Sequence, residues 1–244
     1  MHLQLVRHPQ SPLLYPNPLH RWEAMNVFNA AVIQHHGLFH MHYRAQGVDF
    51  VSSIGYAVSA DGLDWNRMEK PVLAPHNGRE DYRGVEDPRV TPLDGRFYMC
   101  YTAYGANGNY PMIAVSDNMI TWEDVAPLEK TENKDHILFP EKIGGRYAMV
   151  GRQDGKNLYY LTSDRLDCWE DEGSLLMEPE YPWEFIQIGN CGSPIRTDAG
   201  WLLFTHGVGA MRKYALGCAL LDLGDPSKLI GRVREPVLTA VDAD

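Results

Sequence analysis

One sequence pattern occurs three times in this chain, as Ala57-Val58-Ser59-Ala60-Asp61-Gly62-Leu63-Asp64-Trp65, as Ala114-Val115-Ser116-Asp117-Asn118-Met119-Ile120-Thr121-Trp122, and as Leu161-Thr162-Ser163-Asp164-Arg165-Leu166-Asp167-Cys168-Trp169. Each copy predicts a strand, a turn made by Ser and Asp, and an aromatic residue that begins the next strand. Ser and Asp favour such turns because their side chains bind nearby backbone N–H groups. The serines are 57 and 47 residues apart, so the pattern indicates a structural repeat of about 50 residues.

Two further elements recur with similar spacing. A turn glycine followed by an aromatic-rich strand of period two begins at Gly37, Gly95, Gly145 and Gly200. A short apolar element is interpreted as the opening of each repeat, and it occurs as Pro12-Leu13-Leu14, Pro71-Val72-Leu73, Pro127-Leu128, Leu175-Leu176 and Pro236-Val237-Leu238. Strand-rich repeats of this length are typical of β-propeller blades.

The chain contains five of these openings but four repeat bodies. We therefore predict an all-β fold with a five-bladed β-propeller architecture, of which four blades and the start of a fifth are present in this chain. The prediction is a single domain over residues 1–244, with blades at approximately 12–70, 71–126, 127–174 and 175–235 and an incomplete fifth from 236. A closed ring of four blades is the alternative.

Composition and charge narrow the classes of partner. The chain has 244 residues, of which 44% are hydrophobic and 22% charged, and its formal net charge is −10. This acidic balance argues against nucleic acid and against an anionic membrane. Neither an export signal nor an apolar run of membrane-spanning length is visible, so we expect a cytoplasmic protein. No C-x-x-C pair occurs, and we expect free thiols in a reducing compartment for Cys100, Cys168, Cys191 and Cys218.

Polar residues gather in the segments that lead into the predicted innermost strands. In a propeller these segments meet at one mouth of the central channel, so each blade contributes the same repeat position to one pocket. Arg44, Arg152 and His206 occupy the same region of their repeats, which predicts a basic pocket within an acidic protein. The predicted sugar-binding residues of this pocket are Asn29, Glu86, Arg89, Glu141, Lys142, Gln187 and Asn190.

The segment Glu86-Asp87-Pro88-Arg89 is the sharpest motif. Two carboxylates and an arginine beside a rigid proline suit a positioned acid. A carboxylate next to a cation and a carboxylate held by hydrogen bonds have separated proton affinities, as acid catalysis requires. A structural salt-bridge turn is the alternative interpretation of the same residues.

These residues resemble glycoside hydrolase family 130, the β-mannoside phosphorylases and β-1,2-mannosidases. The resemblance runs almost from end to end in collinear order. It is carried by Val27-Phe28-Asn29, Tyr43-Arg44, Ser59-Ala60-Asp61-Gly62, Gly84-Val85-Glu86-Asp87-Pro88-Arg89, Leu138-Phe139-Pro140-Glu141-Lys142, Trp183-Glu184, Gly200-Trp201-Leu202, His206-Gly207, Leu220-Leu221-Asp222-Leu223 and Asp225-Pro226. The family implies a five-bladed propeller, in agreement with the repeats.

The resemblance implies that Asp87 is the general acid and that phosphate is bound by Arg44, Arg152, His206 and Tyr214. Phosphate would then attack the anomeric carbon with inversion and release mannose 1-phosphate. An inverting phosphorylase needs one catalytic carboxylate, because the anion replaces the water and base of a hydrolase. The implied partners are a mannoside oligosaccharide and inorganic phosphate as co-substrate, with no metal and no organic cofactor. A homo-oligomer is left open.

Three departures from the family pattern keep other functions open. Gln187 stands where the phosphorylases carry a lysine, Gln153 follows Arg152 where proline is usual, and the family's last blade is not visible. An inverting β-mannosidase that uses water is therefore a second hypothesis, with Glu86, Glu141 or Glu184 as its base. A non-catalytic sugar-binding propeller or an inactive fragment is a third hypothesis.

Overall fold

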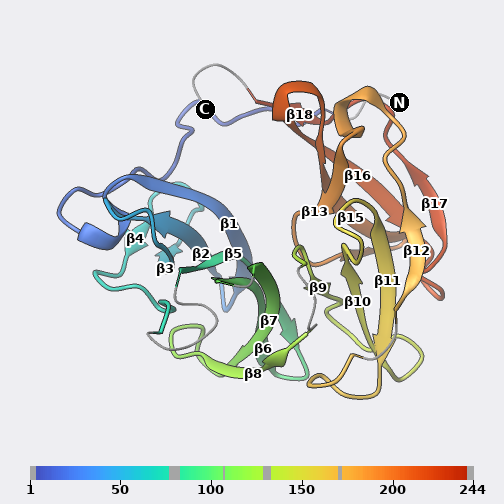
Figure 1. The fold of residues 1–244 in the computed structure, drawn as a ribbon, viewed down its shortest axis with the longest axis horizontal. Helices are drawn as coiled ribbons and strands as arrows, with labels where there is room; N and C mark the ends of the chain where they lie inside the picture. Colours follow the sequence, from blue (N-terminus) through green and yellow to red (C-terminus); the bar gives the residue numbers. More distant parts are fainter. Residues whose placement is uncertain (1–3, 77–82, 107, 129–132, 170–171, 241–244) are drawn as a thin grey trace. The chain divides into compact units, whose positions relative to one another are not determined.

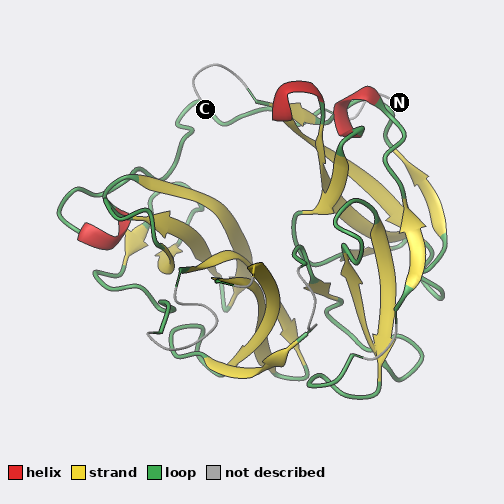
Figure 2. Cartoon of the chain, in the orientation of Figure 1, coloured by secondary structure: helices red, strands yellow, loops and turns green. Residues whose placement is uncertain are grey.

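The computed structural model describes residues 4–76, 83–106, 108–128, 133–169 and 172–240. The fold is all-β: strands dominate, and the helical segments among the described residues are single 3-10 turns (Figure 2). The 3-10 turns are η1 (Arg21–Glu23), η2 (Pro182–Glu184) and η3 (Ala210–Arg212). Within the described ranges, no helix has the length and apolar character needed to span a membrane. The chain forms two compact units, residues 8–132 and residues 133–244 with 1–7, here called the first and the second unit.

The first unit is built from two antiparallel modules, which appear in blue to green in Figure 1. Module 1 consists of β1 (Asn26–His35), β2 (Leu38–Gln46), β3 (Ser52–Ser59) and β4 (Asn66–Arg67). Module 2 consists of β5 (Gly84–Leu93), β6 (Arg96–Gly105), β7 (Gly108–Ser116) and β8 (Glu123–Pro127). A parallel pairing of Ser52 with Gly84 joins the modules into one sheet. The order of strands along each module follows their order along the chain.

The second unit repeats this plan. Module 3 consists of β9 (Ile137–Leu138), β10 (Tyr147–Gly151), β11 (Leu158–Ser163) and β12 (Ser174–Met177). Module 4 consists of β13 (Gln187–Asn190), β15 (Gly200–Val208), β16 (Tyr214–Leu221) and β17 (Leu229–Arg232), with β14 (Ile195–Thr197) beside β15 and β18 (Leu238–Thr239) beside β16. Four antiparallel modules thus follow one another in the described residues, as the repeats predict.

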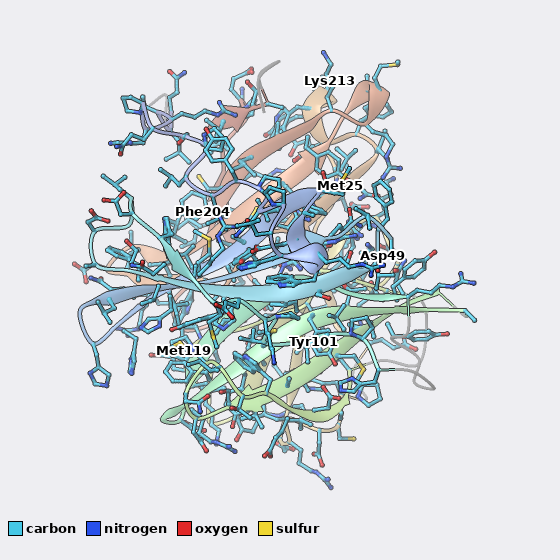
Figure 3. The ribbon with its side chains drawn as sticks, turned by 90° about the vertical axis from the view of Figure 1, so that its left-hand side faces the viewer. Met25, Asp49, Tyr101, Met119, Phe204 and Lys213 are labelled. Carbon is cyan, nitrogen blue, oxygen red and sulfur yellow. The ribbon has the colours of Figure 1, made fainter. Side chains whose placement is uncertain are left out.

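Each unit has its own apolar core. In the first unit the core gathers fully buried residues such as Ile54 and Met99. It also includes Tyr101 and Met119, both labelled in Figure 3. In the second unit the buried Trp201 meets Phe139 edge to face, with ring centroids 5.2 Å apart. Long runs of buried residues along β2, β3, β5 and β6 contribute to the core of the first unit.

The repeated Ser turns form as the sequence predicts. The Ser59 hydroxyl accepts a hydrogen bond from the backbone N–H of Gly62 at 2.9 Å, and the Ser116 hydroxyl accepts one from the N–H of Met119 at 2.8 Å. In module 3 the Ser163 hydroxyl accepts from the N–H of Arg165 at 3.1 Å. These side chains replace backbone partners and so fix the turn between the third and fourth strands of three modules.

Three of the short apolar elements pair with the third strand of the module that precedes them. Leu73 pairs with Ile54 of β3, and the N–H of Leu128 donates to the carbonyl of Pro111 in β7. In the same way the N–H of Val237 donates to the carbonyl of Leu216 in β16, and Leu238 and Thr239 pair with this strand.

Candidate active site

Asp87 lies at a β-bulge in β5, the first strand of module 2. The register between β5 and β6 shifts between Glu86 and Arg89, so β5 carries one extra residue at this point. Asp87 has a left-handed backbone with φ of 54°, which a short polar side chain tolerates better than most. A bulge re-aims the side chains of its strand and is common beside active sites. The guanidinium of Arg89 donates to the backbone carbonyl of Asp87 at 3.0 Å and so supports the bulge.

Asn29 occupies the equivalent place in module 1. The register between β1 and β2 shifts between Phe28 and Ala31, and Asn29 is left-handed with φ of 48°. Its side-chain amide donates a hydrogen bond to Asp87 Oδ1 at 2.7 Å. Two bulges from successive modules therefore bring an amide and a carboxylate together.

Arg44 joins the two carboxylates of the motif. Its Nη1 lies 3.0 Å from Asp87 Oδ1, its Nη2 lies 2.7 Å from Glu86 Oε1, and its Nε donates to the Ser52 hydroxyl at 2.9 Å. The Phe28 ring centroid lies 4.7 Å from Arg44 Cζ. These contacts use three of the five N–H groups of the guanidinium and fix its plane. We call Asn29, Arg44, Glu86, Asp87 and Arg89 the acid cluster.

The second unit holds a basic cluster around Arg152, which follows β10. Arg152 Nη1 lies 2.8 Å from Asp135 Oδ2, and His206 Nε2 lies 3.7 Å from the same oxygen. The side chains of Arg152 and Asp135 are 8% and 5% exposed, so this ion pair is shielded from water. The Tyr214 ring, half exposed, lies 5.9 Å from the His206 ring. We call Asp135, Arg152, His206 and Tyr214 the basic cluster.

Asn190 and Gln187, which the sequence predicts to bind sugar, belong to the same unit as the basic cluster. Asn190 is fully buried, and its amide donates to the backbone carbonyls of Asp135 and Val150. The structure thus places Asn190 as a support for the segment that carries Asp135. Gln187 begins β13 and pairs with Val208 of β15. Gln153, which stands where the family usually has proline, meets His136 Nε2 through its Oε1 at 2.9 Å and holds the same segment from the other side.

Glu141 and Lys142 are not brought to the basic cluster. Both are exposed at the β9–β10 hairpin, where Glu141 lies 3.4 Å from Arg196 and Lys142 lies 4.3 Å from the Tyr147 ring centroid. Asp135 precedes β9 whereas Glu141 follows it, so the two lie toward opposite ends of this strand. Their placement therefore does not support the prediction that these two residues contact the sugar.

Glu184 has a structural setting. It is 1% exposed, accepts the N–H groups of Glu180 and Tyr181, and lies 3.0 Å from Arg232 of β17. Glu23 is the matching residue of module 1, where it is buried and lies 3.1 Å from Arg67 of β4. Both follow a tryptophan in a 3-10 turn. The repetition indicates that the glutamate of each Trp-Glu pair binds the last strand of its module, β4 or β17, through an arginine. This structural role disfavours Glu184 as a catalytic base.

A protein-family model matches nearly the whole chain. The model described as beta-1,4-mannooligosaccharide phosphorylase, that of glycoside hydrolase family 130, matches residues 5–242. The chain belongs to glycoside hydrolase family 130. It is therefore a glycoside phosphorylase or a closely related glycoside hydrolase of carbohydrate metabolism.

Individual relatives give a finer comparison. The 1,2-beta-oligomannan phosphorylase of Thermoanaerobacter sp. (strain X514) is 39% identical over 97% of this chain and 82% of the relative. The beta-1,2-mannobiose phosphorylase of the same organism is 40% identical over 96% of this chain and 82% of the relative. A solved structure described as "The GH130 family of mannoside phosphorylases contains glycoside hydrolases that target beta-1,2 mannosidic linkages in Candida mannan" is 25% identical. It has a TM-score of 0.86 and covers 99% of this chain and 85% of that chain.

Sequence reasoning missed Asp135. Its repeat position matches that of Asn29 and Asp87, since each lies two residues before the residue that resumes pairing with the second strand. All three are left-handed, with φ of 65° at Asp135. The signal is hidden because Asp135 stands ten residues before its turn glycine, Gly145, whereas the other two stand eight residues before theirs.

Proposed function

We propose that this chain catalyses inverting phosphorolysis of β-1,2-linked mannosides to mannose 1-phosphate and a sugar shortened by one mannose. The two Thermoanaerobacter relatives are named for β-1,2 linkages, whereas the family description names a β-1,4 activity. We favour the β-1,2 linkage because identity of 39% and 40% over nearly the whole chain is more specific than a description shared by a family.

Asp87 is the proposed general acid. Its contacts with the Asn29 amide and the Arg44 guanidinium orient the carboxyl group. The acid cluster also offers amide and guanidinium donors to sugar hydroxyls, so Asn29, Glu86 and Arg89 are the proposed sugar-binding residues of this unit.

The basic cluster supplies the observation that carries the proposal. Two basic side chains, Arg152 and His206, lie beside the carboxylate of Asp135. The planar guanidinium fork suits phosphate oxygens, and the Tyr214 hydroxyl adds a neutral donor. We propose Arg152, His206 and Tyr214 as phosphate-binding residues, and Arg44 as a further one through its two remaining N–H groups.

The repeated modules support a finer description of the fold. Four antiparallel modules of four strands recur at about the blade period of a propeller. We propose that they are blades of a five-bladed β-propeller, as the family resemblance implies. The convergence of Arg44, Arg152 and His206 on one anion remains a prediction of that architecture.

Hydrolysis by water is the second candidate, and one contact favours it. Arg44 contacts Glu86 as well as Asp87, so a second carboxylate stands beside the proposed acid. An inverting hydrolase needs such a residue as its base. Of the three carboxylates considered as bases, Glu86 shares the guanidinium of Arg44 with Asp87.

Phosphate dependence tests the proposal. Purified protein is incubated with β-1,2-mannobiose in a phosphate-free buffer, with and without added inorganic phosphate, and consumption of the disaccharide is followed. We expect turnover that saturates with phosphate and is close to zero without it. Equal turnover in both buffers would favour the hydrolase, and no turnover in either buffer would favour a sugar-binding protein.

A further inference from the structure

The carboxylate of Asp135 is the shared partner of the two basic side chains in the second unit. Its Oδ2 lies 2.8 Å from Arg152 Nη1 and 3.7 Å from His206 Nε2. The 2.8 Å separation makes Asp135 and Arg152 a close ion pair. Because both side chains of this pair are more than nine-tenths buried, the guanidinium has little freedom to leave Asp135.

The surrounding backbone fixes the carboxylate in place. Asp135 is left-handed, and the buried Asn190 amide donates to its carbonyl oxygen. The backbone of Gly189 lies against the side chains of His206 and Asp135. A Cβ atom at Gly189 would stand 2.4 Å from the His206 ring and 2.7 Å from Asp135 Oδ2. The imidazole and the carboxylate therefore both pack against the backbone of Gly189, and a larger residue there would clash with both.

We propose that Asp135 is a positioning residue for phosphate. It would hold the Arg152 guanidinium and the His206 imidazole in the orientation that receives the anion, without itself touching the substrate. The proposal rests on the proposed function, because it concerns the phosphate site of a phosphorylase. It also assigns two roles to one repeat position: the acid at Asp87 in module 2, and the support of the basic residues at Asp135 in module 3.

Electrostatics and positioning make opposite predictions for this residue. A carboxylate close to a bound anion repels it, so removal of the charge alone would strengthen phosphate binding. Loss of the charged ion-pair partner instead frees Arg152 and weakens binding. The sign of the change in phosphate affinity thus separates the two effects.

Asp135→Asn is the informative variant. Asn tolerates the left-handed backbone of this position, keeps the size of the side chain and removes the charge. Asp135→Glu is the second variant, since it keeps the charge but displaces the carboxylate by one methylene. Asp164→Asn is the matched control, because Asp164 pairs with Arg146 in the same unit at an exposed site. Circular dichroism and the thermal midpoint report whether each variant is folded.

The readouts are the KM for phosphate, the KM for β-1,2-mannobiose, and the Kd for inorganic phosphate by calorimetry without sugar. For both Asp135 variants we expect the KM and Kd for phosphate to rise by about tenfold or more, as for disruption of a buried ion pair. The KM for mannobiose should change less, and Asp164→Asn should match the parent. If the parent requires phosphate but Asp135→Asn binds phosphate equally or more tightly, the positioning role is wrong. If the parent neither binds nor requires phosphate, the proposed function fails as well.

Discussion

Asn29 and Asp87 occupy the same bulged, left-handed position in two successive modules, and the Asn29 amide donates to the Asp87 carboxylate over 2.7 Å. The repeat thus brings its own equivalent residues into contact. One copy supplies a neutral donor and the other supplies the proposed acid. This relationship motivates the first two predictions.

Asp87→Asn should lower kcat for mannobiose phosphorolysis by about 10²–10⁴-fold, which is the usual contribution of general acid catalysis. Asn tolerates the left-handed backbone and keeps the hydrogen-bonding size, but it has no proton to transfer. Asp94→Asn is the control, because Asp94 is also left-handed and lies in the β5–β6 turn. An activated aryl mannoside, whose leaving group needs little protonation, should lose less activity. Near-normal turnover of mannobiose would make Asp87 structural.

Asn29→Gly should lower kcat by about tenfold, the effect of losing one hydrogen bond to a charged group. Glycine accepts the left-handed conformation of residue 29, so the backbone is kept while the amide is removed. Asn26→Ala is the control, since the Asn26 amide in the same strand donates to Gln46. Steady-state kinetics at saturating phosphate provide the measurement. Equal rates for Asn29→Gly and the parent would show that Asp87 does not need the Asn29 amide for its orientation.

Arg152→Gln should raise the KM for phosphate more than the KM for mannobiose. Gln keeps much of the side-chain length but has neither the charge nor the planar fork that suits phosphate. Arg146→Gln removes an equal charge from a surface pair of the same strand region and should leave both constants unchanged. A larger rise in the mannobiose KM than in the phosphate KM would place Arg152 in sugar binding.

His42 makes the stability of the first unit depend on pH. Its Nε2 donates to the carbonyl of Met119 at 2.8 Å, and burial lowers its pKa from 6.5 to about 4. Between these values the unfolded chain binds more protons than the folded one. The free energy of unfolding should therefore fall as pH falls from 6.5 to 4, by up to about 3 kcal/mol from this residue.

Urea titrations at several pH values check this dependence. His42→Gln should flatten it by about one proton, whereas His36→Gln, at an exposed site, should leave it unchanged. An equal slope for the parent and His42→Gln would contradict the assignment to His42.

The sequence predicts the repeats well because they follow local rules. Ser turns, turn glycines and alternating aromatic strands are set within a few residues, and all of them appear where expected. The contact partners are harder to predict. Glu184 looked like a candidate base because its partner Arg232 is 48 residues away, and only the folded chain brings this cation to it. Asp135 is hard to identify from the sequence because ten residues separate it from its turn glycine, Gly145, instead of the eight found in modules 1 and 2. The sequence also does not show which sheet edge an apolar segment joins, and only the fold pairs Leu238 and Thr239 with β16.

The identity of the released mannose derivative tests the central claim most directly. The purified protein is incubated with β-1,2-mannobiose and inorganic phosphate. Phosphorus NMR follows the signals of inorganic phosphate and of any sugar phosphate, and free mannose is quantified in the same samples. Phosphorolysis with inversion predicts a growing signal of α-mannose 1-phosphate, equal in amount to the mannose released and to the phosphate consumed. Two molecules of free mannose for each mannobiose, with the inorganic phosphate signal unchanged, would contradict phosphorolysis and identify the enzyme as a hydrolase.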